Sequence, residues 1–444
     1  MPSAREVAVL TLAACEKQGA WSNGQLKKNL RQAGLDRRDA ALATRLCFGV
    51  LQNRLLLDFY LGSFSSVRPE KLEPRVRGAL QIALYQLLMM DKIPPSAAVN
   101  ESVSLARRYS RNPRAAGLVN AVLRAFLRAR EENRLPEVKG DTPEGTLSLR
   151  YSHPLWLVEE WTGLLGLEGT QRLLAANNGQ PATVAQVNTL RADAAQTAAA
   201  LAADGVAAEA HPWLPDCLTL TGTGDLERLD AYQKGLFYIQ DAAARLAVTA
   251  AGVEPGARVL DCCAAPGGKS FAAAIAMRDR GEVISCDLHP HKIKLMEAGR
   301  DRLGLTCMTP REQNAKVRVK TWEEGFDFVL ADVPCSGLGI IRKKPDIRFK
   351  DPEELKGLPE IQRAILENVC AYVRPGGVLL YSTCTVRRAE NEGVAEGFLS
   401  AHPEFCPEPF TLPGPAGTGQ GMLTLWPHLH GTDGFFIAKF RRQV

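Results

Sequence analysis

Four side chains capable of chemistry follow successive apolar segments in the second half of the chain. Asp261, Asp287, Asp332 and Cys384 each stand at or just after the C-terminal end of such a segment. Short apolar runs of this kind are typical of buried strands, and the carboxyl ends of strands in an open α/β sheet line one crevice where ligands bind. A lone Asp after a strand is usually a turn residue or a helix cap. Four such residues on successive strands favour a binding site.

The first of these segments runs into the sequence DCCAAPGGKS, residues 261–270. Its Pro-Gly-Gly triplet predicts a tight turn with uncovered backbone N–H groups, followed by a helix whose N-terminus attracts an anionic group such as a carboxylate. The sequence is neither a P-loop nor a GxGxxG motif, which disfavours nucleoside triphosphates and NAD. Asp287, at the end of the next strand, is placed to accept hydrogen bonds from ribose hydroxyls. S-adenosylmethionine satisfies both demands, because it joins an adenosyl group to an amino-acid carboxylate.

Two cysteines complete this set of residues. Cys335 lies in ADVPCSGLG and Cys384 in LLYSTCT, each after a strand and among small polar residues. Most intracellular cysteines are buried, inert thiols. A thiolate with a lowered pKa is, however, a good covalent catalyst. A cysteine nucleophile beside a methyl donor suits the alkylation of an unreactive pyrimidine carbon.

The elements that must position these residues divide the 444-residue chain into three predicted domains. Residues 236–444 alternate strands and helices, which predicts a Rossmann-like α/β domain with a mainly parallel sheet covered on both faces and a C-terminal hairpin. Residues 149–235 mix short helices and strands and predict a small α/β (α+β) domain. Residues 131–148 are polar with Pro and Gly and predict a linker. Residues 1–130 show helical periodicity and predict an all-α bundle.

The charge is distributed unevenly along the chain. Residues 1–130 carry 21 Lys and Arg against 9 Asp and Glu, whereas residues 131–240 carry 7 against 15. A basic first third attached to a less basic remainder indicates an anionic partner, and nucleic acid is the main candidate. Arg107, Arg108, Arg111 and Arg114 stand out because no acid lies between residues 102 and 130. A solvated helix face is the alternative, but we favour contact with RNA phosphates.

Composition excludes several other classes of protein. No apolar run is long enough for a transmembrane helix, and the first residues lack the pattern of a secretory signal, so we expect a cytoplasmic protein that does not bind membranes. The eleven cysteines are scattered and never spaced Cys-x-x-Cys, which disfavours disulfide scaffolds and zinc ribbons. Cys286, His289 and His291 come nearest to a metal cluster, but their spacing differs from that of zinc sites. We therefore expect no metal.

Several long motifs resemble those of a known family. DCCAAPGGKS, ADVPCSGLGIIRKKPDI, LLYSTCTVRRAENE and the terminal GTDGFFIAKF resemble the NOL/NOP/Sun class of RNA cytosine-C5 methyltransferases, and within it the bacterial Sun (Fmu) subfamily. DRRDAALATRLCFGVLQ and GLVNAVLRAFL are similar to the NusB-like RNA-binding bundle at the front of this subfamily. SHPLWLVEEW, QVNTL and GLFYIQDAAARLA resemble the small domain that precedes its catalytic domain. The resemblance covers nearly the whole chain.

The resemblance implies an activity and a set of site residues. The activity is S-adenosylmethionine-dependent methylation of cytosine C5 in small-subunit (16S) rRNA, through an adduct between Cys384 and cytosine C6. Cys335 would assist product release, and Asp332 would lie between cofactor and base. Arg342, Lys343 and Lys344 would help to hold the RNA backbone. The expected cofactor contacts come from Asp261, Cys263, Ala264, Ala265, Pro266, Gly267, Gly268, Lys269, Asp287, Asn314 and Asp332.

The chain departs from the family pattern at two notable positions. Asn314 is the nearest match to an acid that usually meets the adenine, and its amide oxygen could still accept a hydrogen bond from the adenine amine. Gln186 replaces a common arginine, which leaves an RNA role for that position in doubt. The target base must leave its stack, so we expect a loop or partly unfolded RNA, either naked or in an early assembly intermediate. Nothing in the sequence indicates an obligate oligomer, and we expect a monomer.

Three other functions compete with this interpretation. The first is the same chemistry on tRNA or another RNA, since a basic front domain suits any RNA. The second is a non-catalytic RNA-binding factor, which the joint presence of Asp332, Cys335 and Cys384 disfavours. The third is a cysteine hydrolase, which is remote because no histidine stands near either cysteine motif.

Overall fold

The computed structural model describes residues 2–18 and 22–444 and contains two compact units. Unit 1 comprises Met1–Gly179 together with Ile341–Lys350, and unit 2 comprises the remaining residues. The domain boundaries expected from the sequence stay a prediction, because these units are defined by packing and cut the chain at other places. Among the described residues, no helix has the length and apolar character needed to cross a bilayer.

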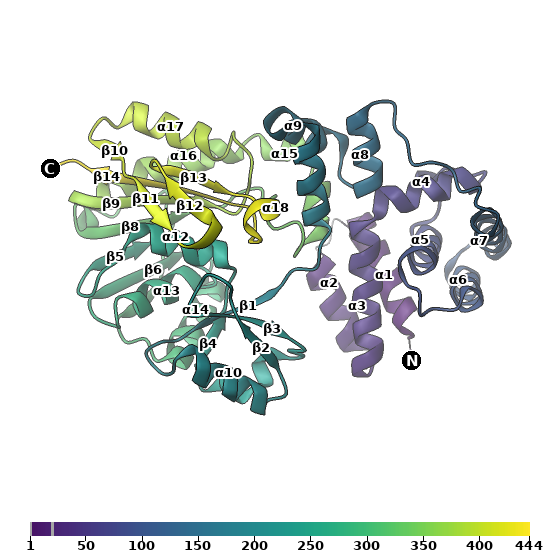
Figure 1. Cartoon of the computed structure of the whole chain (residues 1–444), viewed down its shortest axis with the longest axis horizontal. Coiled ribbons are helices and arrows are strands. Elements are labelled where there is room, and N and C mark those ends of the chain that lie inside the picture. The colour runs from purple at the N-terminus through teal and green to yellow at the C-terminus, as the bar shows by residue number, and fades with distance from the viewer. Residues whose placement is uncertain (1, 19–21) are drawn as a thin grey trace. The chain divides into compact units, whose positions relative to one another are not determined.

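Unit 1 is built from helices (Figure 1), as predicted for the first part of the chain. The predicted linker contains an extended stretch after Glu131 and then the start of a helix capped by Thr142, whose hydroxyl accepts from the Gly145 N–H. The elements are α1 (Ala4–Gln18), α2 (Ser22–Ala33), α3 (Arg37–Gln52), α4 (Arg54–Phe64), η1 (Pro69–Lys71), α5 (Pro74–Met89), α6 (Pro95–Tyr109), α7 (Ala115–Glu131), α8 (Pro143–Tyr151) and α9 (Leu155–Asn177).

Helix α5 forms the centre of the bundle and is buried along most of its length. Its sequence ALQIALYQLL is apolar on nearly every side, which is typical of a helix surrounded by others. The polar side chain of Arg77 is buried there because Asp58 and Glu16 accept hydrogen bonds from its guanidinium at 2.5 and 2.8 Å. A buried cation is tolerated when such partners replace the lost water.

A segment far along the chain also belongs to unit 1. Ile341–Lys350 packs in this unit and contains the 3₁₀ helix η4 (Pro345–Phe349). The Arg348 side chain is fully buried, and its Nη1 donates to the carbonyl oxygens of Gln52 and Ser152 and to Asn178 Oδ1. Burial lowers the pKa of Arg348 to about 9. This anchor was not predicted from the sequence.

The first part of unit 2 is a small antiparallel sheet in the order β2-β3-β1-β4. Its helix α10 begins with a capping box formed by Asp193 and Gln196 and ends before Gly205. Side chains from β1, β3 and α10 form its own small core. The elements are β1 (Thr183–Val187), α10 (Ala194–Ala203), β2 (Ala207–Ala210), β3 (Cys217–Thr221), η2 (Leu226–Arg228), α11 (Asp230–Gln233) and β4 (Phe237–Ile239).

The second part of unit 2 contains the sheet that was predicted to be mainly parallel, in the order β10-β14-β9-β8-β5-β6-β7, with β13 on β14 (Figure 1). Strands β7, β6, β5, β8 and β9 are parallel, and β14 is antiparallel to β9. The chain runs from β5 outward to β7 and then returns to the other side of β5, so the order reverses between β5 and β8. Ligands bind at the carboxyl ends of strands at such a switch point.

Helices cover both faces of this sheet, as predicted from the alternation. Side chains of α12, α13 and α14 form one core cluster, and side chains of α16 and α17 form another. Residues 352–372 form α15, α16 and η5, with Lys356 and Gly357 between the two α-helices. The C-terminal hairpin forms between β13 and β14.

The strands are β5 (Arg258–Asp261), β6 (Glu282–Asp287), β7 (Met308–Glu312), β8 (Phe326–Asp332), β9 (Val373–Thr383), β10 (Phe405–Pro407), β11 (Phe410–Leu412), β12 (Gly417–Gly419), β13 (Met422–Leu425) and β14 (Phe435–Arg442). The helices are α12 (Ala242–Ala251), α13 (Gly268–Ala276), α14 (Pro290–Leu303), η3 (Lys320–Trp322), α15 (Pro352–Leu355), α16 (Leu358–Val369), η5 (Cys370–Tyr372), α17 (Glu392–Ala401), η6 (Gly414–Ala416) and α18 (Pro427–His430).

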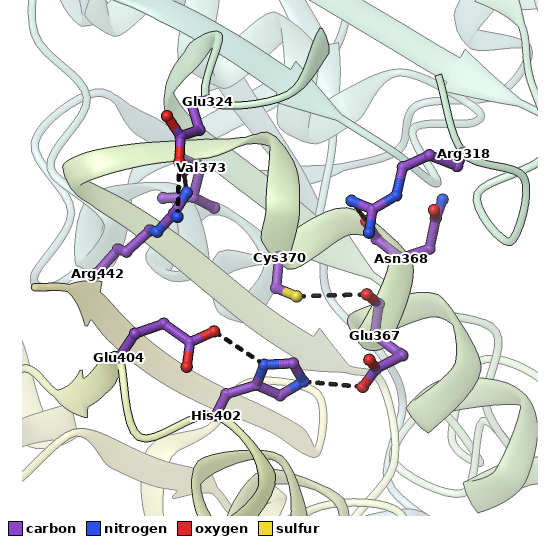
Figure 2. A network of polar contacts seen from close by, with 9 residues as sticks. All are labelled: Arg318, Glu324, Glu367, Asn368, Cys370, Val373, His402, Glu404 and Arg442. Atoms are coloured by element: carbon purple, nitrogen blue, oxygen red, sulfur yellow. Dashed lines mark hydrogen bonds and ion pairs between the residues drawn. The ribbon is translucent and has the colours of Figure 1, made fainter. Parts of the chain in front are cut away.

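A polar network lies at the end of the sheet where β9 begins and β14 ends (Figure 2). His402 lies between the carboxylates of Glu367 and Glu404, at 2.8 and 3.0 Å. Arg442 donates to the carbonyl of Val373 and to Glu324. His402 thus joins α16 to the chain after α17, and Arg442 joins the last strand to the start of β9, both at the end remote from the carboxyl ends of the parallel strands.

Candidate active site

The turn after β5 is the first part of the site. Gly267 has a φ of 112°, and a Cβ at this residue would lie 2.5 Å from Phe271 Cζ, so only glycine fits. The N–H of Ala264 donates to the carbonyl of Cys286 at 2.7 Å, which fixes the turn to β6. The Phe271 ring of α13 therefore fills the space beside Gly267, and the turn packs closely over the start of this helix.

Asp261 lies at the base of this turn and is fully buried. Burial raises the pKa of its carboxyl to about 7, although the Ser270 hydroxyl donates to it at 2.7 Å and opposes the shift. Ser285 of β6 donates in turn to Ser270 at 2.8 Å. This chain of hydrogen bonds joins β5, α13 and β6 beneath the turn.

Asp287 ends β6, the strand next to β5, as predicted. Its carboxylate accepts from the His289 N–H at 3.0 Å and lies 3.4 Å from Lys292 Nζ. Leu288 follows it with 53% of its surface exposed. Asn314 lies just after β7, and its Oδ1 accepts from the N–H of Lys316 at 3.0 Å. The sequence interpretation did not single out Leu288, although its place directly after the strand-ending acid was a usable signal.

Asp332 ends β8 on the other side of β5, also as predicted. Its Oδ2 accepts from Lys269 Nζ at 2.6 Å, and its Oδ1 accepts from the Ser382 hydroxyl at 2.9 Å. The Lys269 ammonium also lies 4.9 Å from the centre of the Phe435 ring. Lys269 was grouped with the cofactor contacts in the sequence analysis. In the structure its ammonium pairs with the Asp332 carboxylate.

Cys335 and Cys384 meet beside this ion pair. Their Sγ atoms are 3.3 Å apart, although 49 residues separate them in the chain. The hydrogen bond from Cys335 lowers the pKa of the Cys384 thiol, burial opposes this, and the nearby ammonium of Lys269 lowers it further. The same hydrogen bond raises the pKa of Cys335 well above its usual value of 9. Of the two thiols, Cys384 therefore loses its proton more readily.

A buried carboxylate supports the two cysteine loops. Glu390 has no exposed surface, and its Oε2 accepts from the Ser336 N–H at 2.8 Å and from Gln362 Nε2 at 3.0 Å. The hydroxyls of Ser336 and Thr385 lie 2.7 Å apart and join the residues that follow each cysteine. Glu390 lies within a motif quoted above but was not predicted as a site residue. Gln362 carried no signal in the sequence.

Glycines allow the backbones of these loops to approach closely. The N–H of Gly339 donates to the Cys384 carbonyl at 3.0 Å, and the N–H of Gly434 donates to the Gly339 carbonyl at 2.9 Å. A Cβ on Gly339 would lie 1.9 Å from the Gly434 oxygen. The loop after Cys335 is thus held directly against the backbone of Cys384.

The arginines predicted to bind RNA lie in unit 1. Arg107 and Arg108 belong to the last turn of α6, and Arg111 and Arg114 lie in the loop before α7. All four are exposed. The structure brings an acid to this basic run from elsewhere, because Arg108 pairs with Glu6 of α1 at 3.1 Å.

The second predicted RNA-binding group, Arg342, Lys343 and Lys344, lies in the segment Ile341–Lys350 of unit 1. Lys344 is exposed, and the other two are half-buried. Gln186 is buried in β1, where its Nε2 donates to the Gln240 carbonyl at 3.1 Å. In the described part of the chain, no three His, Cys, Asp or Glu side chains gather as metal ligands would.

Comparison with known proteins identifies the family. A model of 16S rRNA methyltransferase RsmB/F matches residues 248–441, and models of the NusB family and of an RsmF/B-like ferredoxin-like domain match residues 2–128 and 153–227. The probable ribosomal RNA small subunit methyltransferase B of Bacillus subtilis is 37% identical over 99% of both chains. The chain belongs to the RsmB/F family of rRNA methyltransferases. The resemblance inferred from the motifs, including the NusB-like front domain, is confirmed.

Other RsmB/F relatives extend the likeness over the whole chain. The probable ribosomal RNA small subunit methyltransferase B of Synechocystis is 34% identical over 100% of both chains, and ribosomal RNA small subunit methyltransferase B of Vibrio cholerae is 32% identical over 91% of this chain and 90% of its own. The crystal structure of PH0851 aligns with a TM-score of 0.81 and 25% identity over 100% of this chain and 99% of its own. NSun6 from Pyrococcus horikoshii, solved with SFG, has a TM-score of 0.56 and 21% identity over 64% of this chain and 97% of its own, which shows a shared fold.

Proposed function

We propose that this RsmB/F-family enzyme methylates C5 of a cytosine in 16S rRNA with S-adenosylmethionine as donor, through a bond between Cys384 Sγ and cytosine C6. The observation that carries the proposal is the pair of thiols 3.3 Å apart, beside the carboxylate of Asp332 and the ammonium of Lys269. An unreactive pyrimidine carbon needs both a nucleophile at C6 and groups that offset charge on the ring.

The residues at the switch point fit S-adenosylmethionine. The N–H groups of Ala264 and Gly267 already donate to carbonyls, so the first turn of α13, which begins at Gly268, would receive the carboxylate. The Asp287 carboxylate, at the end of the neighbouring strand, suits ribose hydroxyls. Asn314 and the exposed Leu288 come after β7 and β6, where the adenine attached to that ribose would lie. When bound, S-adenosylmethionine would supply an electrophilic methyl group to C5.

The first step belongs to Cys384. Its thiolate adds to cytosine C6, the C5=C6 double bond opens, and C5 becomes enamine-like and able to take the methyl group. The hydrogen bond with Cys335 and the ammonium of Lys269 lower the pKa of Cys384, which favours its thiolate form. Asp332 accepts from the N4 amine of the base, and its partner Lys269 offsets negative charge that spreads into the ring.

Product release reverses the addition. A base removes the C5 proton, the electron pair of that C–H bond restores the C5=C6 double bond, and the Sγ–C6 bond breaks with Cys384 leaving as a thiolate. Cys335 assists this step, because its thiol is the donor nearest to the departing sulfur, at 3.3 Å.

The RNA is held mainly through its phosphates. The exposed Arg107, Arg108, Arg111 and Arg114 of unit 1 offer cations for this purpose, and Lys344 offers another. The target cytosine must leave its stack, which costs a few kcal/mol and costs least in single-stranded RNA. We propose that a monomer acts on naked rRNA or on an early assembly intermediate.

Covalent trapping tests the proposal. Cys335→Ala and Cys384→Ala variants are incubated with 16S rRNA and S-adenosylmethionine, and protein–RNA adducts are detected by denaturing electrophoresis. Cys335→Ala should accumulate an adduct because release is impaired, whereas Cys384→Ala should form none. Cys370→Ala is a matched control, because this buried thiol lies in the polar network at the opposite end of the parallel strands.

Two results would contradict the assignment of roles. Full turnover by Cys384→Ala would exclude this thiol as the nucleophile. An adduct that persists in Cys384→Ala but disappears in Cys335→Ala would exchange the roles of the two cysteines.

A further inference from the structure

The loops that carry Cys335 and Cys384 are both held by two adjacent residues, Glu390 and Asn391, which lie directly before α17. Both side chains are buried, with exposed fractions of 0% and 1%. The Tyr381 hydroxyl of β9 donates to the carbonyl of Glu390, which fastens this pair of residues to the strand that leads to Cys384. The pair is therefore a fixed reference from which each loop can be positioned.

Glu390 holds the loop of Cys335 on both sides of the cysteine. Its Oε2 accepts directly from the Ser336 N–H at 2.8 Å. It also accepts from Gln362 Nε2 at 3.0 Å, and the same nitrogen donates to the Pro334 carbonyl at 3.0 Å. One carboxylate oxygen thus restrains, directly and through one amide, the two peptide groups that flank Cys335.

Asn391 makes the corresponding pair of bonds on the other loop. The Thr383 hydroxyl donates to its Oδ1 at 2.6 Å, and its Nδ2 donates to the Thr385 carbonyl at 3.1 Å. These two threonines stand immediately before and after Cys384. The side-chain amide therefore spans the residue whose thiol has the lower pKa of the two.

This use of Asn391 is made at the expense of α17. The carbonyl of Asn391 accepts from the N–H groups of Val394 and Ala395, as the residue before the first turn of a helix does. An asparagine in this place usually caps the helix by accepting from its first N–H groups with the side chain. Here the side chain makes no such bond. Its direction is explained by the loop of Cys384 rather than by the stability of the helix.

We propose that Glu390 and Asn391 are positioning residues that place the two sulfur atoms against each other, Glu390 through the backbone of Cys335 and Asn391 through the backbone of Cys384. The inference rests on the proposed function in one respect, because it then follows that Asn391 governs formation of the adduct and Glu390 its release. A role confined to folding would not separate these two steps, since both side chains are buried at the same place in the fold.

Alkylation of Cys384 tests the role of Glu390 without RNA. The rate of modification by iodoacetamide is measured against pH in wild type, in Glu390→Ala, in Glu390→Gln, and in Cys335→Ala with and without Glu390→Ala. Glu392→Ala is the matched control, because this neighbouring carboxylate accepts from the Thr424 hydroxyl of β13 and from neither cysteine loop.

Glu390→Ala should lower the alkylation rate below the pKa of Cys384 about tenfold, as expected for loss of the contact with Cys335. Glu390→Gln should keep most of the wild-type rate, because one amide oxygen can accept both hydrogen bonds. Added to Cys335→Ala, Glu390→Ala should change the rate by less than about twofold, since the contact is already missing. A further tenfold loss in that background, or a wild-type profile in Glu390→Ala, would overturn the role of Glu390.

Formation of the adduct tests the role of Asn391. Its rate is measured in a single turnover with 16S rRNA and S-adenosylmethionine, in Cys335→Ala with and without Asn391→Ser. Serine is a favoured helix cap but is too short to join Thr383 to Thr385, so it preserves α17 and removes the span. The combined variant should form the adduct about ten- to a hundredfold more slowly, since a misplacement of about 1 Å can cost a hundredfold. Glu390→Ala with Cys335 intact should instead accumulate adduct.

Equal rates of adduct formation with and without Asn391→Ser would overturn the role of Asn391. Absence of any adduct from Cys335→Ala alone would overturn the proposed function and the assignment of steps with it. The alkylation profiles decide separately whether Glu390 positions Cys335, because they need neither RNA nor methyl transfer.

Discussion

The ionisation of Cys384 depends on its neighbour Cys335, and the Cys335→Ala variant exposes that dependence. The 3.3 Å contact is the largest cause that lowers the pKa of Cys384, and burial and the charge of Asp332 act in the opposite direction. Without the Cys335 thiol, the ammonium of Lys269 is the remaining group that lowers the pKa of Cys384. The pKa of Cys384 must therefore rise in this variant.

The size of the rise follows from the strength of the lost bond. Hydrogen bonds to charged groups contribute about 1.5–3 kcal/mol, and a thiol is a weak donor, so the lower end applies. At 1.36 kcal/mol per pKa unit, the loss corresponds to an upward shift of about one unit. Below the pKa, the thiolate fraction and the rate of any reaction of Cys384 as a thiolate should fall about tenfold. At high pH the rates should converge.

Alkylation of the free enzyme measures this shift without RNA. Iodoacetamide modification of the peptide containing Cys384 is followed by mass spectrometry as a function of pH in wild type, Cys335→Ala and Cys335→Ser. The serine variant keeps a hydroxyl donor and should shift by less than the alanine variant. An unchanged alkylation profile in Cys335→Ala would refute the hydrogen-bond argument and leave Lys269 as the main cause.

Three further predictions concern other parts of the molecule. Lys269→Met removes the cation beside Asp332 and should lower the single-turnover methylation rate about ten- to a hundredfold, since a charged hydrogen bond contributes about 1.5–3 kcal/mol; a rate within twofold of wild type would contradict its role. Arg348→Met leaves buried carbonyls of unit 1 without their donor and should lower the free energy of unfolding by about 2–3 kcal/mol in urea titrations, whereas an unchanged midpoint would show that the anchor is dispensable. Burial lowers the pKa of His402, but hydrogen bonds to two glutamates outweigh it and raise the pKa above 6.5 (Figure 2). His402→Ala also loses the contact of the ring with Phe398, which is independent of pH. Below pH 6.5 it should lose under about 1 kcal/mol more, and this additional loss should vanish as the pH rises through the folded-state pKa; a stability difference that does not change between pH 5 and pH 9 would refute the assignment.

The fold and the edge that carries the site were predictable because they depend on local patterns. Alternating apolar strands and helices specify a parallel sheet, and Asp261, Asp287 and Asp332 end neighbouring strands of it, with Cys384 just after a fourth. Parallel strands bring their carboxyl ends together whatever the intervening loops do. The meeting of two cysteines from distant motifs followed from that topology.

The remaining features depend on contacts that no local pattern specifies. The ammonium of Lys269, at the start of α13, donates to Asp332 at the end of β8. The Pro-Gly-Gly turn in the sequence does not indicate the direction of this side chain. Glu390 is an acid in a charged stretch of sequence, and it is buried where Ser336 and Gln362 supply donors and Arg387 lies 3.7 Å from its carboxylate. Arg348 follows two lysines in a run that reads as an exposed basic patch, yet its side chain is fully buried.

The central claim is tested most directly by methyl transfer to purified RNA. Labelled S-adenosylmethionine is incubated with the wild-type protein and either naked 16S rRNA or total tRNA, with Cys384→Ala as control, and the RNA is digested so that the labelled nucleoside is identified by mass. The account predicts 5-methylcytidine in the rRNA alone and none with Cys384→Ala. Label in another nucleoside, label confined to tRNA, or unchanged transfer by Cys384→Ala would contradict it.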